Sequence, residues 1–286
     1  MKIVEVTALS KTFQKNSVLS DINFSLEEGT FMALLGKNGS GKSTVLNILM
    51  GNEKLDSGEC FLFGKSIKDD PAKLKNLIGH VSENVQFDYP VPVETFLKGY
   101  GKLFNEFDYD FIEKTAKTLK IPLNKQFSGY SRGQKMQIVL LAALAHKPKL
   151  LLIDEVTSVL DAFSRKFFMS LLKEFTQKGG SVLITTNIVN EVQYYCNSVV
   201  FLDKKKVKFQ TKISDIPSTF QKIRIKDPNH SVLKEPGVIW VGINSDGTQS
   251  YIAPEEVYAK HDNLEKDMRA VTLEDLYIYH SQDSDK

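Results

Sequence analysis

The stretch 36–44 combines the residue types that a phosphate-binding loop needs. It reads Gly-Lys-Asn-Gly-Ser-Gly-Lys-Ser-Thr and fits the pattern G-x-x-x-x-G-K-[ST]. Its glycines let successive backbone N–H groups turn toward phosphate oxygens, and a helix that opens at Gly41 adds its positive dipole end there. Lys42 brings a full charge to the β- and γ-phosphates, and the Ser43 hydroxyl is placed to ligate Mg²⁺. The candidate nucleotide-binding residues of this loop are Gly36, Lys37, Asn38, Gly39, Ser40, Gly41, Lys42, Ser43 and Thr44.

The flanks of this loop supply the elements that must position it. The apolar run 31–35 has the length of a buried strand, and apolar residues continue from 45 to 50 without a breaker until Gly51. Strand, glycine loop and helix therefore follow in the order that the pattern requires, which disfavours a chance glycine turn. The sequence predicts a nucleotide site at this point.

Asp154 and Glu155 are adjacent acids at the end of a second candidate strand. The run 150–153 is wholly apolar, as expected of a strand in a parallel sheet that is covered on both faces. Ligands bind at the carboxyl ends of strands in open α/β sheets. This placement favours a functional role for the two acids over a chance surface position.

The remaining patterns predict an α/β fold with additions. Strand patterns open the chain as an antiparallel β subdomain, and strand and helix patterns then alternate as in a mostly parallel sheet. A helical insertion interrupts them, with its second helix expected to open at Asp110 and Glu113 completing a capping box. A further helix is expected over 189–196. Short alternating segments after residue 213 suggest a small C-terminal α+β appendage. The predicted units are 1–213, with a helical subdomain at about 86–147, and an accessory region at 214–286.

Composition and charge exclude some classes of protein. The chain has 286 residues, of which 42% are hydrophobic and 25% charged, as in an ordinary soluble globular protein. A net charge of +2 gives no electrostatic case for nucleic-acid binding. Lys204, Lys205 and Lys206 are expected in a solvated hairpin. Cys60 and Cys196 have no metal-ligand or redox spacing and are expected to be free thiols in a reducing cytosol.

No stretch of the sequence is predicted to cross a membrane. The apolar run 138–145 is too short for a bilayer, and the charged start at residues 1–6 is not followed by the apolar region of a signal peptide. If the protein works at a membrane, another chain is expected to supply the spanning part.

Four motifs in order carry a family resemblance. They are the loop 36–44, the segment 130–134, the strand with its acids at 150–155, and the segment 158–161. Together they resemble the ATP-binding cassette of ABC transporters over about the first 210 residues. The resemblance implies a P-loop NTPase core of the RecA-like type, ATP and Mg²⁺ as cofactors, and Mg²⁺-dependent hydrolysis of ATP to ADP and phosphate.

The resemblance also implies catalytic roles. Asp154 looks like the acid that holds Mg²⁺ together with Ser43, and Glu155 like the general base that polarises the attacking water. Glu83 stands where the family has a glutamine that contacts Mg²⁺ and the water, and a glutamate can still ligate the cation. Asn187 stands where the family has a histidine that contacts the γ-phosphate. An amide carries no charge, so we expect a competent but slow ATPase.

Other positions match motifs that act between two cassettes. Ser131, Gly133 and Gln134 fit the signature motif, which in this family approaches the γ-phosphate bound by the opposite subunit. Arg132 replaces the first glycine of its usual pair. Asp161 falls at the loop of contacts between cassettes, and Phe13 falls where the family stacks an aromatic ring on adenine. The resemblance therefore implies a head-to-tail dimer around two nucleotides, formed by this chain with itself or with a paralogous cassette.

The leading function is the ATPase subunit of a membrane transporter, at the cytoplasmic face of the membrane through separate transmembrane permease subunits. Phe87, Tyr89 and Phe96 are the candidate contacts with these subunits, or ordinary core residues. The end of the chain at 271–277 is similar to that of bacterial exporters of drugs, antibiotics or small peptides, such as the phenol-soluble-modulin system. The alternative is a soluble ATPase of the same family that acts in translation, DNA repair or cofactor assembly. That class usually has a second cassette or a long coiled coil, and this sequence has neither. No nucleic-acid partner is expected.

Overall fold

The structure, a computed structural model, describes residues 1–69, 74–82, 90–227, 229–261, 264–267 and 270–282. Its central sheet has the strand order β10-β9-β3-β8-β7-β6. The strands are β3 (Phe31–Leu35), β6 (Ile78–Ser82), β7 (Leu150–Asp154), β8 (Ser181–Thr186), β9 (Ser198–Asp203) and β10 (Lys206–Lys212). Neighbouring strands pair in parallel except β10, which runs antiparallel to β9. The predicted α/β fold with a mostly parallel sheet is confirmed.

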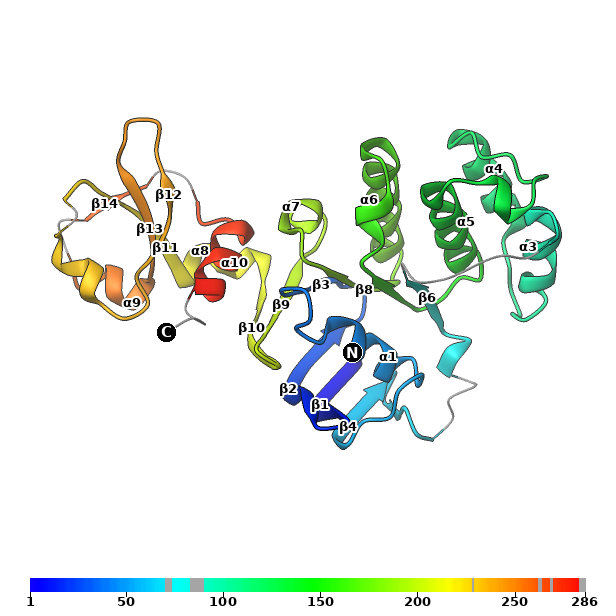
Figure 1. Ribbon diagram of the computed structural model, residues 1–286, viewed down its shortest axis with the longest axis horizontal. Helices are drawn as coiled ribbons and strands as arrows, with labels where there is room; N and C mark the ends of the chain where they lie inside the picture. The colour runs from blue at the N-terminus through cyan, green and yellow to red at the C-terminus, as the bar shows by residue number, and fades with distance from the viewer. Residues whose placement is uncertain (70–73, 83–89, 228, 262–263, 268–269, 283–286) are drawn as a thin grey trace.

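Alternate residues of the central strands enter two different cores. Phe31 and Ala33 of β3 pack into a core with α5 (Arg132–Ala145) and α6 (Ala162–Gln177). Met32 and Leu34 pack into a second core with α1 (Lys42–Leu49) and the N-terminal strands. Successive side chains of a strand point to opposite faces, so a strand that is covered on both sides is apolar throughout. Figure 1 shows α5 and α6 on one side of the sheet and α1 with β1, β2 and β4 on the other.

The N-terminal strands form an antiparallel sheet of their own. Its order is β2-β1-β4-β5, built from β1 (Lys2–Phe13), β2 (Asn16–Glu27), β4 (Ser57–Leu62) and β5 (Lys65–Ser66). Ile22, Phe24 and Leu26 of β2 are buried, whereas Asn23 between them is exposed and donates to Oδ1 of Asp21 at the surface. The predicted antiparallel subdomain is confirmed.

The segment predicted as a helical insertion, about 86–147, contains α3 (Val93–Gly101), α4 (Tyr109–Thr118) and α5. Aromatic rings join the helices: Tyr100 and Phe104 have ring centroids 5.1 Å apart, and Phe104 stacks on His146 at 4.2 Å. The expected start of α4 was wrong. The N-cap is Asp108, whose Oδ1 accepts a hydrogen bond from the Phe111 N–H, so Asp110 lies inside the first turn.

The segment that enters β9 also differs from the prediction. The helix expected over 189–196 is confined to α7 (Val189–Val192). Asn197 explains the early end, because its side-chain Oδ1 accepts from the Phe31 N–H and its own N–H donates to the Phe31 carbonyl, which draws the chain toward the sheet. After β9, Lys204 and Lys205 make the tight turn to β10 with positive φ angles of 44° and 69°.

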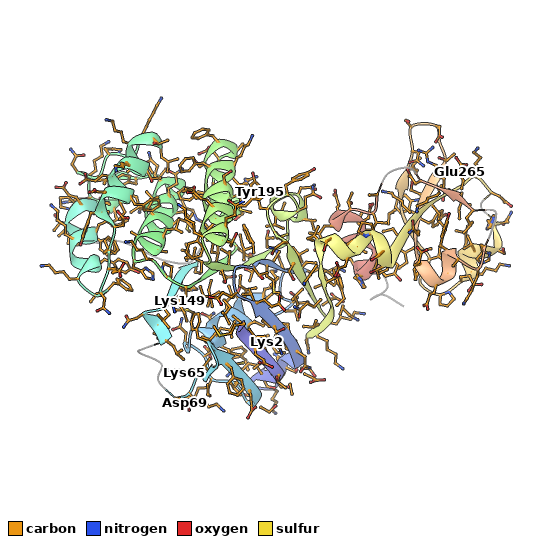
Figure 2. The ribbon with its side chains drawn as sticks, turned by 180° about the vertical axis from the view of Figure 1, so that it is seen from behind. Lys2, Lys65, Asp69, Lys149, Tyr195 and Glu265 are labelled. Atoms are coloured by element: carbon orange, nitrogen blue, oxygen red, sulfur yellow. The ribbon has the colours of Figure 1, made fainter. Side chains whose placement is uncertain are left out.

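The C-terminal residues build a third sheet with the order β12-β13-β11-β14. Its strands are β11 (Phe220–Ile225), β12 (Ile239–Ile243), β13 (Gln249–Pro254) and β14 (Glu265–Lys266), and its helices are α8 (Ile216–Thr219), α9 (Glu255–Tyr258) and α10 (Leu273–Gln282). Short 3₁₀ turns lie at Phe127–Gly129, Val156–Val159, Ile213–Asp215 and Ser231–Lys234. In Figure 2, Glu265 lies in this third sheet, at the end of the molecule far from Lys2.

The C-terminal region has a small core of its own and also shares the main one. Ile223, Val232 and Ala253 belong to the small core. Ile252 and Leu276 are buried in the same cluster as residues of α5 and α6. The division of the chain at 213/214 stays a prediction.

Candidate functional site

The phosphate-binding loop lies between the central strand β3 and α1. A Cβ atom at Gly36 would overlap the carbonyl oxygen of Leu202 in β9, so only glycine fits there. Gly41 has φ +104°, and a Cβ atom at that position would lie 2.5 Å from Cδ2 of Leu19. These two glycines let the loop pass close to its neighbours and turn into α1 in a conformation that other residues rarely adopt.

The loop presents donors that suit a phosphate group. Gly41 is the N-cap of α1 and offers no side-chain cap, so the first N–H groups of this helix remain available for an anion. The Ser40 Oγ is buried and has no hydrogen-bond partner among the described residues. An orphaned buried hydroxyl in a loop of backbone N–H groups fits a nucleotide phosphate.

Lys42 lies at the centre of the site with 3% of its surface exposed. Its Nζ donates to the carbonyl oxygens of Gly36 at 3.0 Å and Lys37 at 3.3 Å. The third contact is an ion pair with Oε1 of Glu155 at 3.0 Å. An ammonium has three N–H donors, and three oxygen atoms face them here.

Asp154, at the end of β7, gathers two hydroxyl groups. Its Oδ1 accepts from the Ser43 Oγ at 3.0 Å and from the Thr185 Oγ1 at 2.6 Å. Two hydroxyls and a carboxylate are the hard oxygen donors that Mg²⁺ prefers, so the residues present fit the cation. The sequence analysis missed Thr185. It is a polar residue in the buried strand β8, but its pairing opposite Asp154 requires the strand order.

Glu155 adopts a backbone conformation that is unusual for its type, with φ 50°. Its N–H donates to the Thr185 carbonyl at 3.2 Å, which holds the turn against β8. The side chain is 29% exposed. A strained residue at a strand end is typical of functional sites, and here the strain aims a partly solvated carboxylate at Lys42.

Asn187 follows β8 and contacts the phosphate loop directly. Its amide Nδ2 donates to Oδ1 of Asn38 at 2.9 Å, and both residues are exposed. The structure therefore brings together the loop residues, the two acids and Asn187 at the carboxyl edge of the sheet.

The signature residues lie at the start of α5, in contacts with their own element. The Ser131 Oγ accepts from the Gln134 N–H at 3.2 Å, and the Gln134 Oε1 accepts from the Ser131 N–H at 3.1 Å, which forms a capping box. A Cβ atom on Gly133 would lie 3.1 Å from the Val159 carbonyl oxygen. Asp161 is the N-cap of α6 and accepts from both the N–H and the hydroxyl of Ser164, and these hydrogen bonds lower the pKa of its carboxyl group. Ser131 and Asp161 are exposed.

The other predicted residues are less informative. Phe13 is 38% exposed, and the Lys11 ammonium lies 4.8 Å from its ring centroid, a cation–π contact. Phe96 is half-buried and meets Phe127 edge to face at 5.2 Å, inside the helical layer. Glu83, Phe87 and Tyr89 lie outside the described residues.

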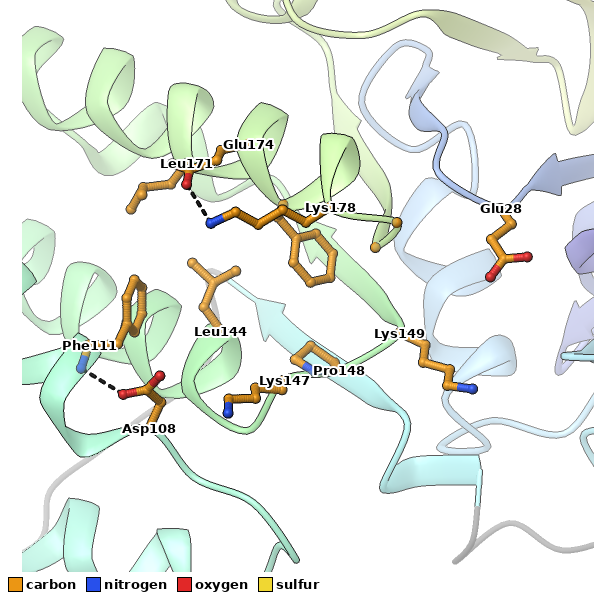
Figure 3. Close-up of a pocket in the computed structure, with 13 residues that line it drawn as sticks. Glu28, Asp108, Phe111, Leu144, Lys147, Pro148, Lys149, Leu171, Glu174 and Lys178 are labelled. Atoms are coloured by element: carbon orange, nitrogen blue, oxygen red, sulfur yellow. Dashed lines mark hydrogen bonds and ion pairs between the residues drawn. The ribbon is translucent and has the colours of Figure 1, made fainter.

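A cavity of about 820 Å³ lies at the opposite edge of the sheet. Figure 3 shows it between α4, α5 and the end of α6, with Lys149 at the start of β7 on its wall. Three of its charged residues have partners: Lys178 pairs with Glu174 at 2.6 Å, and Asp108 caps α4. Its position at the amino ends of the strands separates it from the phosphate loop, so it is not part of the candidate site.

Comparison with known proteins identifies the family of this chain. The family described as ABC transporter matches residues 19–158. The zinc uptake system ATP-binding protein ZurA of Listeria innocua is 33% identical, over 71% of this chain and 84% of ZurA. The chain belongs to the ABC transporter family. As a member of that family it is an ATP-binding subunit and an ATPase.

Two further relatives of the ABC transporter chain extend this comparison. The linearmycin resistance ATP-binding protein LnrL of Bacillus subtilis is 29% identical, over 71% of this chain and 67% of LnrL. A solved ATP-binding cassette, a dimeric post-hydrolysis state bound to ADP and Pi, is 24% identical with a TM-score of 0.64, over 73% of this chain and 98% of that one. At 24% sequence identity, the comparison with the solved cassette shows that the two chains share a fold. Within the described residues, no helix is both long and apolar enough to cross a membrane.

Proposed function

We propose that this ABC ATPase powers an exporter by binding ATP at the loop 36–44 and hydrolysing it with Glu155 as the general base. The observation that supports this function is the convergence of Lys42, Ser43, Asp154 and Glu155 at one edge of the sheet, in contacts of 3.0 Å. Phosphoryl transfer needs positioning and charge neutralisation more than covalent chemistry, and these residues supply both.

The ion pair between Lys42 and Glu155 defines how the site responds to substrate. A γ-phosphate oxygen competes with the Glu155 carboxylate for the same ammonium. Once displaced, the carboxylate can accept a proton from a water molecule, whose oxygen bonds to the γ-phosphorus while the bond to the ADP oxygen breaks. Bound Mg²⁺, held by Ser43 and Asp154, would neutralise phosphate charge. The products are ADP and inorganic phosphate.

Asn187 and Glu83 are proposed to make this turnover slow. Asn187 donates a neutral amide N–H where the family supplies a histidine, and a neutral donor stabilises developing phosphate charge less than a charged one. Its hydrogen bond to Asn38 ties it to the loop and must be exchanged for a phosphate contact. Glu83 is proposed as a further ligand of the cation.

A second cassette is proposed to complete the site. Ser131 and Asp161 are exposed N-cap residues, so the N-terminal ends of α5 and α6 lie at the surface. We propose that Ser131, Gly133 and Gln134 contact the nucleotide bound by the opposite cassette, and that Phe13 stacks on adenine. The partner is a second copy of this chain or a paralogue. A relative solved as a dimer supports this arrangement.

The proposed location is the cytoplasmic face of the membrane, bound to transmembrane permease subunits through residues near 87–96. The name of LnrL associates that relative with resistance, which supports export of a drug, antibiotic or small peptide, whereas the name of ZurA associates that relative with uptake. Residues 1–213 are proposed as the cassette and 214–286 as the accessory region.

The experiment uses the chain together with the multi-span membrane protein that co-purifies with it, reconstituted in lipid vesicles. ATP turnover should require the permease-bound form and should be lost in Glu155→Gln. Deletion of the gene should sensitise cells to membrane-active peptides or antibiotics. Co-purification with ribosomes and no permease would support the soluble alternative, and a growth defect cured only by added nutrient would indicate import.

A further inference from the structure

Helix α10 is fixed at its first turn to the accessory sheet. Both carboxylate oxygens of Asp275 lie 2.9 Å from the Nζ of Lys222 in β11. The two side chains are 9% and 11% exposed. Asp275 also accepts from the Thr272 N–H, while the Thr272 hydroxyl accepts from the Asp275 N–H. A partly desolvated, bidentate ion pair fixes orientation strongly, so the start of α10 and β11 form one unit.

The middle of α10 packs on the central sheet. The rings of Tyr277 and Phe201 meet edge to face at 5.4 Å, and His280 stacks on Phe209 at 4.1 Å. These partners belong to β9 and β10, and β9 is the direct neighbour of β3. Figure 1 shows the red helix α10 between the third sheet and these two strands.

The last turn of α10 reaches the phosphate loop. The Lys37 Nζ donates to the Ser281 carbonyl oxygen at 3.5 Å, across 244 positions of sequence. A cation at the C-terminal end of a helix is favourable because the helix dipole is negative there. The carbonyl of the same Lys37 accepts from the Lys42 Nζ at 3.3 Å. Helix α10 also contacts α7, which follows Asn187.

We propose that Lys37 is a positioning residue that ties the phosphate loop to the C-terminal end of α10, so that the accessory region sets the affinity for nucleotide. The inference rests on the proposed nucleotide site. Lys37 acts through its backbone: its side chain is held by α10, and its carbonyl helps to orient the ammonium of Lys42. Anchoring of α10 by Lys222 and Asp275 is what gives the accessory region this influence.

The test is a titration of the full chain with a fluorescent ATP analogue. Lys37→Met keeps most of the length of the side chain but removes the donor, and a deletion of residues 278–286 removes the acceptor. Each should weaken binding about twofold to fivefold, as expected for one exposed contact at a helix end. In the permease-bound form, each should raise KM with kcat nearly unchanged. Lys37→Arg should retain the wild-type affinity, and Lys226→Met, at a surface lysine of the accessory sheet, should leave it unchanged.

The double variant decides between an indirect and a direct role. If Lys37 acts through α10, Lys37→Met has no further effect once residues 278–286 are removed. An equal loss in the truncated chain would mean that Lys37 contacts the nucleotide itself, and the inference would be wrong.

Lys222→Met is a second way to weaken the link between the accessory sheet and the phosphate loop, and it leaves α10 complete. Lys222→Met should weaken binding in the wild-type chain but not in Lys37→Met, and unchanged binding in the wild-type chain contradicts the proposed coupling. Thermal unfolding checks that each variant is folded. Lys42→Ala distinguishes a failure of the proposed nucleotide site from a failure of the proposed role of α10. Unchanged binding in that variant overturns the nucleotide site as a whole, whereas lost binding with a silent Lys37→Met overturns the role of α10 alone.

Discussion

The ammonium of Lys42 and the carboxylate of Glu155 form an ion pair at 3.0 Å, which joins the phosphate loop to the end of β7. The residue proposed to bind phosphate and the residue proposed to activate water therefore contact each other. Under this proposal, substrate must separate the two side chains before either can act.

Glu155→Gln tests the assigned base. We expect turnover to fall about 100-fold or more, because a positioned general base contributes roughly that much, while ATP binding is retained or strengthened by the loss of a competing carboxylate. Turnover and equilibrium binding are measured on the same permease-bound preparation. Glu174→Gln, on the exposed face of α6, is the matched control, and unchanged turnover in Glu155→Gln would refute the role of Glu155.

Asn187→His tests whether the amide limits the rate. A histidine can carry charge and neutralise developing phosphate charge better, so we expect turnover to rise while ATP affinity stays similar. Steady-state kinetics at several ATP concentrations separate kcat from KM. A large fall in kcat would show instead that the pairing of Asn187 with Asn38 is required as it stands.

Thr185→Val tests the hydroxyl that supports Asp154. Valine keeps the shape of the side chain but removes the donor at 2.6 Å, so the carboxylate loses one of its two hydroxyl partners. We expect a several-fold higher Mg²⁺ concentration for half-maximal turnover and a loss of about 1 kcal/mol in the free energy of unfolding. Thr211→Val on β10 is the control. A Mg²⁺ dependence that does not change would contradict the proposed role.

His146 provides a prediction about pH. Burial lowers the pKa of its imidazole below 6.5, so the folded state prefers the neutral ring that stacks on Phe104. The unfolded chain then binds more protons as the pH falls through 6.5, and the free energy of unfolding should decrease below that pH and level off above it.

Urea unfolding at several pH values between 5 and 8, about the range in which a histidine titrates, measures this dependence. Because burial lowers the pKa of His80 in the same direction, His146→Phe should reduce the pH dependence without abolishing it. An unaltered slope in His146→Phe would show that this ring does not contribute.

Much of the fold could be predicted because its signals are local. The phosphate loop, the apolar strand β3 before it and the acids at the end of β7 are each readable within a short window. What could not be predicted depends on neighbours that are distant in sequence. Thr185 meets Asp154 only because β8 lies beside β7, and α7 ends early because Asn197 binds Phe31 in another strand.

Some local signals were present but ambiguous. Asp108 and Asp110 are both acceptable N-cap residues, and the choice of Asp108 depends on how α4 meets the end of α5, where the Asp108 N–H donates to the Ala145 carbonyl. The approach of Lys37 to Ser281 had no signal in the sequence, since an exposed lysine and a backbone carbonyl carry no pattern.

The central sheet separates two hydrophobic cores, because neighbouring residues of one strand pack into different cores. Met136 of α5 belongs to the core on one side and Val45 of α1 to the core on the other. We therefore expect truncations of Met136 and Val45 to destabilise the protein independently, with additive losses in the free energy of unfolding.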